Sequence, residues 1–260
     1  MKINVTEGDS PLVLAQPHGG TEIPPEILAR LNATGRAIED TDWHISRLYD
    51  GLVDGVTVVS TPIHRYVIDA NRDPSGQSLY PGQYTTGLCP TTTFDDIALY
   101  RDGEEPSADE VSQRQLQYHQ PYHDALSEQL QRIHQRHGFV VLYDCHSIRS
   151  QVPSLFEGQL PDFNIGTNEG TTCSAKITQA VEDACAQAKH YSQVSNGRFK
   201  GGWTTRHYGK PEAGYHAIQM ELAQCNYMQE SSPWNYDGAK AKNLRVTLKT
   251  ILEDLVTALE

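Results

Sequence analysis

Short apolar runs alternate along this chain with segments of helical periodicity, and this alternation restricts the fold more than any other feature of the sequence. The runs that read as buried strands are 11–16, 56–60, 64–70, 139–143 and 217–222. Amphipathic patterns predict helices at 42–52, 172–188 and 238–260, and a long helix or a helical hairpin at 109–137 that is broken near Pro121. Strands separated by helices are typical of α/β folds. We therefore predict an α/β fold in which residues 1–260 form a single domain, with a mixed, mostly parallel sheet flanked by helices.

The composition excludes two classes of partner. The 260 residues include 21 Lys and Arg against 33 Asp and Glu, and the resulting net charge of -12 repels nucleic-acid phosphates. No run approaches the roughly 18 apolar residues that cross a bilayer, and the N-terminus lacks a secretory signal. Five scattered cysteines without a CxxC pair indicate reduced thiols. We expect a cytoplasmic protein without nucleic-acid or membrane partners, either a monomer or a small homo-oligomer.

Polar side chains directly follow three of the predicted strands. They are His18, the pair Asn71 and Arg72, and His146. In open α/β sheets ligands bind outside the carboxyl ends of the strands, so these side chains are expected to converge. Neutral imidazole is a common zinc ligand. Asp144 lies on the same side of an extended chain as His146, so its carboxylate can support a metal site by a hydrogen bond to a metal-bound histidine. Each histidine can instead be a local residue bonded to backbone.

A third metal ligand is needed if the two histidines bind zinc, because a catalytic zinc ion normally takes three protein ligands. A carboxylate is the natural candidate. Glu22 lies four residues after His18, and Asp42 opens the next predicted helix. Either acid can equally be a solvated side chain or a helix cap, and the spacing does not choose between them.

Glu221 is a candidate general base. It lies near the end of the predicted strand 217–222, where burial raises the pKa of a carboxyl group. A carboxyl with a raised pKa suits proton transfer at neutral pH. The alternative is a strand acid that pairs with a neighbouring cation.

Three arginines are candidates for contact with a substrate. Arg72 can grip a carboxylate with two parallel hydrogen bonds, or it can pair with Asp69 or Asp73. Arg65 can place a second cation in the same cleft. Arg206 belongs to a glycine-hinged segment that is predicted to act as a lid or a substrate clamp.

Two further features have weaker implications. The segment 73–108 shows no clear period and is predicted to be a long loop, of the kind that is usually functional or mobile. His119 and His123 have the i,i+4 spacing of a helical metal site. Pro121 between them, and the absence of a His-Glu signature, favour a surface pair or a core contact.

An ordered set of motifs resembles the N-formylglutamate deformylase (amidohydrolase) family, which is similar to zinc carboxypeptidases and aspartoacylase-type amidohydrolases. The set covers roughly residues 10–230, almost the whole chain. Its members are PHGGTEIP (17–24), DTDWHISRLYDGL (40–52), YVIDANRDP (66–74), QPYHDAL (120–126), VLYDCHS (141–147), GGWTTRHYGKP (201–211) and HAIQMELAQCNYM (216–228). The resemblance implies a sheet of about eight strands and one zinc ion held by two histidines and a carboxylate.

The metal ligands implied by the resemblance are His18, His146 and one acid. The carboxypeptidase pattern has a glutamate three residues after the first histidine, but Thr21 stands there in this chain. Asp42 is favoured as the third ligand because an acid followed by Trp opens the corresponding helix in the relatives, and Glu22 is the alternative.

The activity implied by the resemblance is hydrolysis of N-formyl-L-glutamate to L-glutamate and formate in histidine degradation. Glu221 matches the general base and Arg65 the residue that polarises the scissile carbonyl. Asn71 and Arg72 match the pair that binds the α-carboxylate, and Arg206 is expected to meet the side-chain carboxylate. The alternatives are a related zinc amidohydrolase or peptidase acting on another N-acyl amino acid, and a metal-free binding protein on the same fold.

Overall fold

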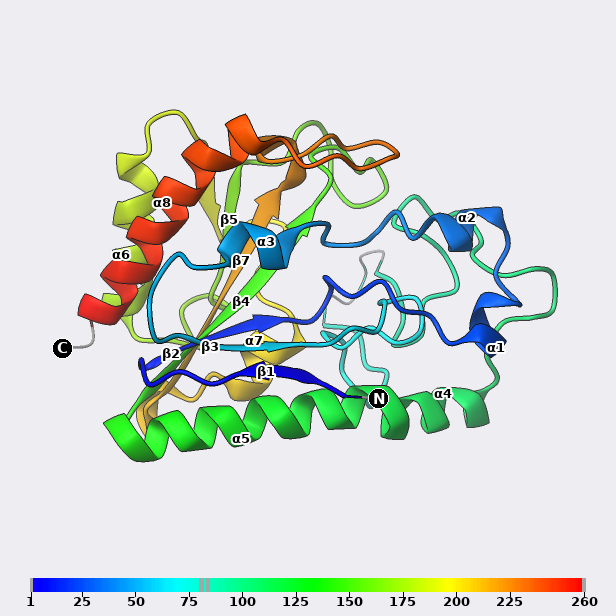
Figure 1. The fold of residues 1–260 in the computed structure, drawn as a ribbon, viewed down its shortest axis with the longest axis horizontal. Helices are drawn as coiled ribbons and strands as arrows, with labels where there is room; N and C mark the ends of the chain where they lie inside the picture. The colour runs from blue at the N-terminus through cyan, green and yellow to red at the C-terminus, as the bar shows by residue number, and fades with distance from the viewer. Residues whose placement is uncertain (1, 80–81, 83–84, 259–260) are drawn as a thin grey trace.

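A mixed β-sheet forms the centre of the molecule (Figure 1), as seen in a computed structural model that describes residues 2–79, 82 and 85–258. The strand order is β1-β3-β2-β4-β7-β5-β6. The strands are β1 (Asn4–Thr6), β2 (Leu12–Gln16), β3 (Thr57–Ser60), β4 (Val140–Ile148), β5 (Phe163–Gly166), β6 (Gln193–Ser195) and β7 (Tyr215–Ala223). Only the pairs β1–β3 and β5–β7 are antiparallel among these strands. The predicted α/β fold with a mixed, mostly parallel sheet is confirmed, with seven strands in the described part of the chain where about eight were expected.

Helices cover both faces of this sheet. On one face, α3 (Ile45–Tyr49), α6 (Ala175–Gln187) and α8 (Gly238–Thr257) bury apolar side chains against β2, β4, β5 and β7. On the other face, α5 (Gln120–His137) packs against β2, β3 and β4, and it runs along the bottom edge of Figure 1. Because both faces of β4 are covered, its first residues form a continuous apolar run instead of an alternating one.

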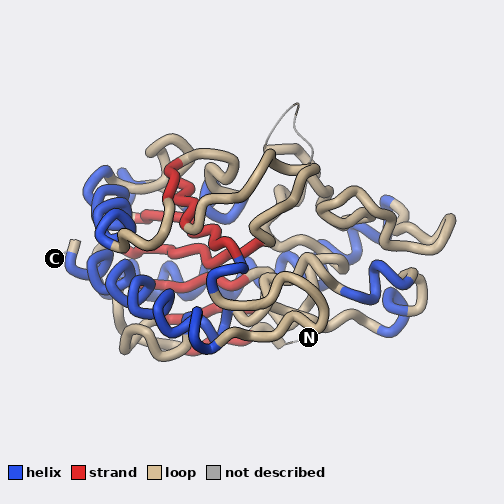
Figure 2. The backbone as a smooth tube through the Cα atoms, turned by 90° about the horizontal axis from the view of Figure 1, so that it is seen from above, coloured by secondary structure: helices blue, strands red, loops and turns tan. Residues whose placement is uncertain are grey.

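The half of the molecule away from the helices α6 and α8 consists mostly of loops, as Figure 2 shows. It contains the short helices α1 (Pro25–Leu28) and α2 (Ala33–Ala37), and also α4 (Ala108–Arg114), which continues through a π-helical turn, η1 (Gln115–His119), into α5. The break predicted near Pro121 is therefore wrong, because 109–137 is one continuous helical segment in which the π-helical turn η1 directly precedes the turn that contains Pro121.

One predicted strand, 64–70, is wrong. This segment forms a buried turn in which the Val67 amide donates to the His64 carbonyl. Its apolar residues Tyr66, Val67 and Ile68 pack with residues of the loop-rich half, such as Leu88 and Leu99, in a cluster separate from the two faces of the sheet. The segment is apolar because it is buried, and burial without periodicity does not identify a strand.

Other boundaries also differ from the prediction. The helix expected at 42–52 begins only after His44, as α3, so Asp42 lies in the preceding turn. The segment expected to be a glycine-hinged loop contains α7 (Trp203–Tyr208), and two 3-10 turns, η2 (Pro211–Ala213) and η3 (Gln224–Asn226), flank β7. The predicted loop 73–108 has no helix or strand in its described residues before Ala108, where α4 begins; residues 80–81 and 83–84 of it lie outside the described residues. No helix in the described part of the chain is long and apolar enough to span a membrane.

Candidate active site

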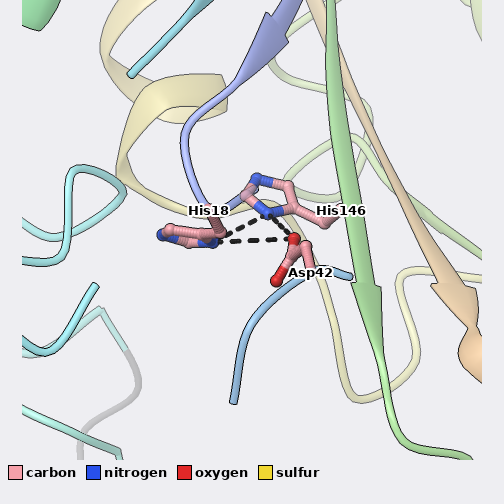
Figure 3. A group of neighbouring side chains, drawn as sticks. All are labelled: His18, Asp42 and His146. Carbon is pink, nitrogen blue, oxygen red and sulfur yellow. Dashed lines mark hydrogen bonds and ion pairs between the residues drawn. The ribbon is translucent and has the colours of Figure 1, made fainter. Parts of the chain in front are cut away.

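His18, Asp42 and His146 meet at the carboxyl end of the sheet (Figure 3) and form the one group among the described residues that can hold a metal ion. The two Nδ1 atoms lie 3.1 Å apart, and Asp42 Oδ2 lies 3.3 Å from His146 Nδ1 and 3.8 Å from His18 Nδ1. Ligands of a tetrahedral zinc ion are separated by about 3.3 Å when the metal–ligand distance is about 2.0 Å. The donor types and their spacing therefore fit a zinc site.

The turn before α3 positions Asp42. Its backbone amide donates to the His18 carbonyl at 3.1 Å, and its Oδ2 accepts from the Ser147 amide at 3.1 Å. Asp42 does not cap α3, whose N-terminal cap is His44. Glu22, the alternative carboxylate, is exposed and its backbone bridges to Ile63, so the structure places Asp42 and not Glu22 beside the two histidines.

The outer nitrogen of each histidine faces a buried carboxylate. His18 Nε2 lies 2.7 Å from Asp69 Oδ1, and His146 Nε2 lies 3.1 Å from Asp144 Oδ1. Metal-bound histidines usually donate their second N–H in this way, which fixes the tautomer and the ring orientation. Asp144 lies where the sequence predicted an acid behind His146. The role of Asp69 was missed, because in the sequence it stood only as a partner for Arg72.

The surroundings favour the metal-binding protonation state for His18 and Asp42 but not for His146. Burial lowers the pKa of His146, but the Asp144 carboxylate and the hydrogen bonds to Asp144 and Asp42 outweigh it and raise this pKa well above its usual value, so a metal ion must displace a proton there. Burial and the Arg65 guanidinium lower the pKa of His18 to about 4, so its imidazole is neutral at pH 7. Burial alone would raise the pKa of Asp42, but a hydrogen bond from His146 and the charges of His18 and Arg65 bring it below its usual value. Neutral imidazole and ionised carboxylate are the forms that bind zinc.

Glu221 lies next to the histidine cluster because β7 pairs in parallel register with β4. Glu221 is opposite His146 in that register, and Gln219 Nε2 donates to Glu221 Oε2 at 3.3 Å. Burial raises the pKa of Glu221 to about 8, with Asp42 and Asp144 adding to the increase and His146 and Arg65 opposing it. The raised pKa predicted for this carboxyl is therefore present in the structure.

A pocket with a cavity volume of about 70 Å³ opens over the cluster and brings together most of the residues singled out in the sequence. Those that line it are His18, Arg65, Asn71, Arg72, His146 and Glu221. Arg65 contacts the metal-ligand cluster directly, with Nη2 2.9 Å from His18 Nδ1 and Nη1 3.5 Å from Asp42 Oδ1.

The Asn71–Arg72 pair forms one wall of the pocket. Asn71 Nδ2 lies 3.0 Å from His146 Nε2, and Asn71 Oδ1 accepts from the Thr204 amide at the start of α7. Arg72 donates from Nε and Nη2 to the carbonyl and hydroxyl oxygens of Thr86, and its Nη1 lies 3.6 Å from Asp69 Oδ2. Thr86 belongs to the 73–108 loop, which therefore supplies part of the wall.

Arg206 is not among the described residues that line this pocket. Its Nε donates to the Gly201 carbonyl at 2.9 Å and its Nη1 to the Leu79 carbonyl at 3.3 Å. The helix α7 turns this side chain toward backbone, whereas the sequence suggested an open, glycine-hinged loop that presents it to a ligand.

Arg198 and Phe199 line the same pocket and were not anticipated from the sequence. They follow β6, a three-residue edge strand that was not predicted. The one available signal was the glycine-rich composition of residues 196–215, which indicated a loop but not its place beside the pocket.

Comparison with known proteins gives one consistent result. The sequence profile of the N-formylglutamate amidohydrolase family matches residues 10–228. An N-formylglutamate deformylase of Pseudomonas aeruginosa is 45% identical over 98% of this chain and 96% of its own length. A second protein of that name, from Pseudomonas putida, is 43% identical over 96% of this chain and 94% of its own.

Solved structures agree with this result. The crystal structure of an N-formylglutamate amidohydrolase from Ralstonia eutropha is similar to this chain with a TM-score of 0.79 and 26% identity, over 97% of this chain and 96% of that one. A protein from Agrobacterium tumefaciens shares the fold, with a TM-score of 0.73, 17% identity and coverage of 99% of this chain and 96% of that one. The chain belongs to the N-formylglutamate amidohydrolase family.

Proposed function

We propose that this chain is a zinc-dependent N-formylglutamate deformylase, which hydrolyses N-formyl-L-glutamate to L-glutamate and formate. The observation that carries the proposal is the convergence of three zinc-type donor atoms, from His18, Asp42 and His146, beside the buried carboxyl of Glu221 in one pocket. The names of the curated relatives, at 43–45% identity over nearly the whole chain, support the substrate. On this proposal one domain, residues 1–260, acts in the cytoplasm in histidine degradation.

The chain's own residues account for the proton transfers of this reaction. A zinc ion held by His18, Asp42 and His146 supplies Lewis acidity toward a carbonyl oxygen and a water molecule. Without a metal ion beside it Glu221 has a pKa of about 8 and is mostly protonated at pH 7, and the positive charge of a bound zinc ion would lower this pKa. In its ionised form Glu221 takes a proton from the attacking water and later gives it to the leaving amine. Formate and the free amine of glutamate are the products.

The arginines account for binding and charge stabilisation. Arg65, which contacts the metal-ligand cluster, faces the carbonyl oxygen as negative charge develops on it. Asn71 and Arg72 hold the α-carboxylate, because their amide and guanidinium lie on the wall next to His146. An acidic protein with a net charge of -12 needs such a local basic pocket to attract a dianionic substrate.

The experiment that tests the proposal is formate release from N-formyl-L-glutamate by the purified protein, before and after chelation and zinc addition. Activity that is lost with the chelator and restored by zinc supports both the reaction and the metal. If the zinc-loaded protein releases no formate, the proposal is overturned. Rates on a panel of other N-acyl amino acids and small peptides then identify a sister amidohydrolase or peptidase, and a chain that neither binds zinc nor turns over any of them is a binding protein.

A further inference from the structure

We propose that Arg198 recognises the side-chain carboxylate of the substrate and thereby selects an acidic N-formyl amino acid, an inference that builds on the proposed function. N-formylglutamate carries two carboxylates separated by three carbon atoms. Its α-carboxylate is assigned to Asn71 and Arg72, which leaves the distal carboxylate without a partner. Arg206, the residue that the sequence suggested for it, does not line the described part of the pocket, whereas Arg198 does.

The guanidinium groups of the pocket are divided between two regions. Arg65 contacts the metal-ligand cluster through Asp42 and His18, and Arg72 lies 3.6 Å from Asp69, the acid behind His18. Arg198 instead belongs to the segment that crosses back from β6 toward α7, and its Nε donates to the Leu155 carbonyl at 2.8 Å. Arg65 and Arg72 therefore lie against the acids around the two histidines, although Arg65 also packs over Phe94, with its guanidinium carbon 4.8 Å from the ring centre. Arg198 lines the pocket from the segment between β6 and α7.

The wall that carries Arg198 is chemically suited to a glutamyl side chain. Its guanidinium carbon lies 5.5 Å from the centre of the Phe199 ring, and Phe199, Leu155, Ile148 and Phe94 also line the pocket. These apolar groups can contact two methylene groups, and the guanidinium beyond them can meet a carboxylate. Among the described residues of the lining, Glu221 is the one acid, so the pocket does not repel a second anionic group from this wall.

The position of this wall is fixed by packing. Ile148 and Phe94 belong to a small apolar cluster with Val152 and Leu160, and Phe199 packs against it, with its ring 6.2 Å from that of Phe156. A guanidinium that donates to a backbone carbonyl on a packed support loses little freedom when it binds a ligand. This arrangement is typical of a residue that sets specificity.

The test compares two substrates that differ only at the distal group, N-formyl-L-glutamate and N-formyl-L-glutamine, in wild type and in Arg198→Met. A charge-assisted hydrogen bond contributes enough that kcat/KM for the glutamate derivative should fall about 10- to 100-fold, mostly through KM. For the glutamine derivative kcat/KM should change less than about threefold, so the preference for the acid collapses. Arg198→Lys should restore part of the preference, because it keeps the charge but not the planar fork.

The control is Arg101→Met, which removes an exposed guanidinium that is not part of the pocket lining and should leave the preference as in wild type. The proposal is overturned if Arg198→Met keeps the wild-type preference, if both substrates lose activity equally through kcat, or if Arg206→Met is the variant that removes the preference. Wild-type turnover of N-formylglutamate tests the proposed function separately, because the Arg198 result is a ratio between two substrates within each protein.

Discussion

Two pairs of neighbouring histidines contact the Asn71–Arg72 segment, His146 of one pair at the Asn71 side chain and His119 of the other at the Arg72 carbonyl. The ring centroids of His18 and His146 are 4.8 Å apart, and those of His119 and His123 are 4.4 Å apart. Both pairs are buried. The geometry of the rings alone therefore does not distinguish a metal site from a packed pair.

The partners of the outer nitrogens make the difference. In the first pair each Nε2 faces a carboxylate, and both Nδ1 atoms point at Asp42. In the second pair each Nε2 lies against a backbone carbonyl, at 2.7 Å from Ala70 for His123 and 3.1 Å from Arg72 for His119. A carboxylate makes an imidazole a better metal ligand, whereas a carbonyl fixes the position of the chain that carries it. The second pair therefore supports the backbone on either side of Asn71.

The largest effect is expected from removing a ligand of the first pair. His146→Ala should lose the bound metal ion, and formate release should fall by about 10⁴-fold or more, since enzymes supply rate enhancements of 10⁶ and above. His119→Ala, the matched change in the second pair, should still bind one metal ion per chain. Metal content after dialysis and initial rates measure both variants. Equal metal loss in the two variants would remove the distinction between the pairs.

Glu221→Gln separates proton transfer by Glu221 from metal binding by the first histidine pair. The amide keeps the size of the carboxyl but cannot accept the proton, so kcat should fall about 10²- to 10⁴-fold while the metal content stays at the wild-type level. The control is Glu169→Gln, which makes the same replacement of a carboxylate by an amide at an exposed position. Near-normal turnover in Glu221→Gln would contradict the role proposed for this residue.

The sequence predicted the parts of the site that follow regular strands. His18 lies just after β2 and His146 lies in β4. The alternation of strands and helices was enough to predict that these two side chains lie close together. The raised pKa of Glu221 could be predicted because Glu221 is the one acid in an apolar run, and burial has a large and general effect on the pKa of a carboxyl.

The parts that depend on loops could not be derived from periodicity. Asp69 and Arg65 lie in a buried turn that the apolar pattern presents as a strand, and Arg198 follows an edge strand of three residues. Their positions depend on contacts with segments far away in the chain, such as the hydrogen bond from Arg198 to Leu155. No local spacing encodes such contacts, and for the same reason the sequence did not show that the Arg206 side chain donates to the Gly201 and Leu79 carbonyls.

A smaller effect is expected from the carboxylates behind the first pair. Asp69→Asn and Asp144→Asn should each weaken metal affinity about 10- to 100-fold, because the histidine loses the negative partner that raises its basicity. Competition with a chromogenic chelator measures the affinity. Asp73→Asn, in the turn just beyond the Asn71–Arg72 pair, is the control and should not change it. Unchanged affinity in both buried variants would mean that these acids only balance the charges of Arg65 and Arg72.

The smallest effect on activity, and a distinctive one on stability, is expected from His123→Phe in the second pair. Burial and the neighbouring His119 and His207 lower the pKa of His123 to about 3, below the 6.5 of an unfolded histidine. Between pH 6.5 and 3 the unfolded chain therefore binds a proton that the folded chain does not, so the free energy of unfolding falls as the pH falls. From pH 6.5 to 5 this loss amounts to about 2 kcal/mol in wild type. Phenylalanine cannot take up the proton, so the stability difference between wild type and His123→Phe should shrink by that amount over this range. Urea unfolding of the chelated proteins at pH 8 and pH 5 measures this change in the stability difference.

The control is Tyr208→Phe, which removes the hydroxyl beside His123 Nδ1 but keeps the imidazole and should retain the pH dependence of wild type. A stability difference for His123→Phe that is the same at both pH values would show that this ring gains a proton in the folded protein, and the second pair would then no longer be a neutral support for the Asn71–Arg72 backbone.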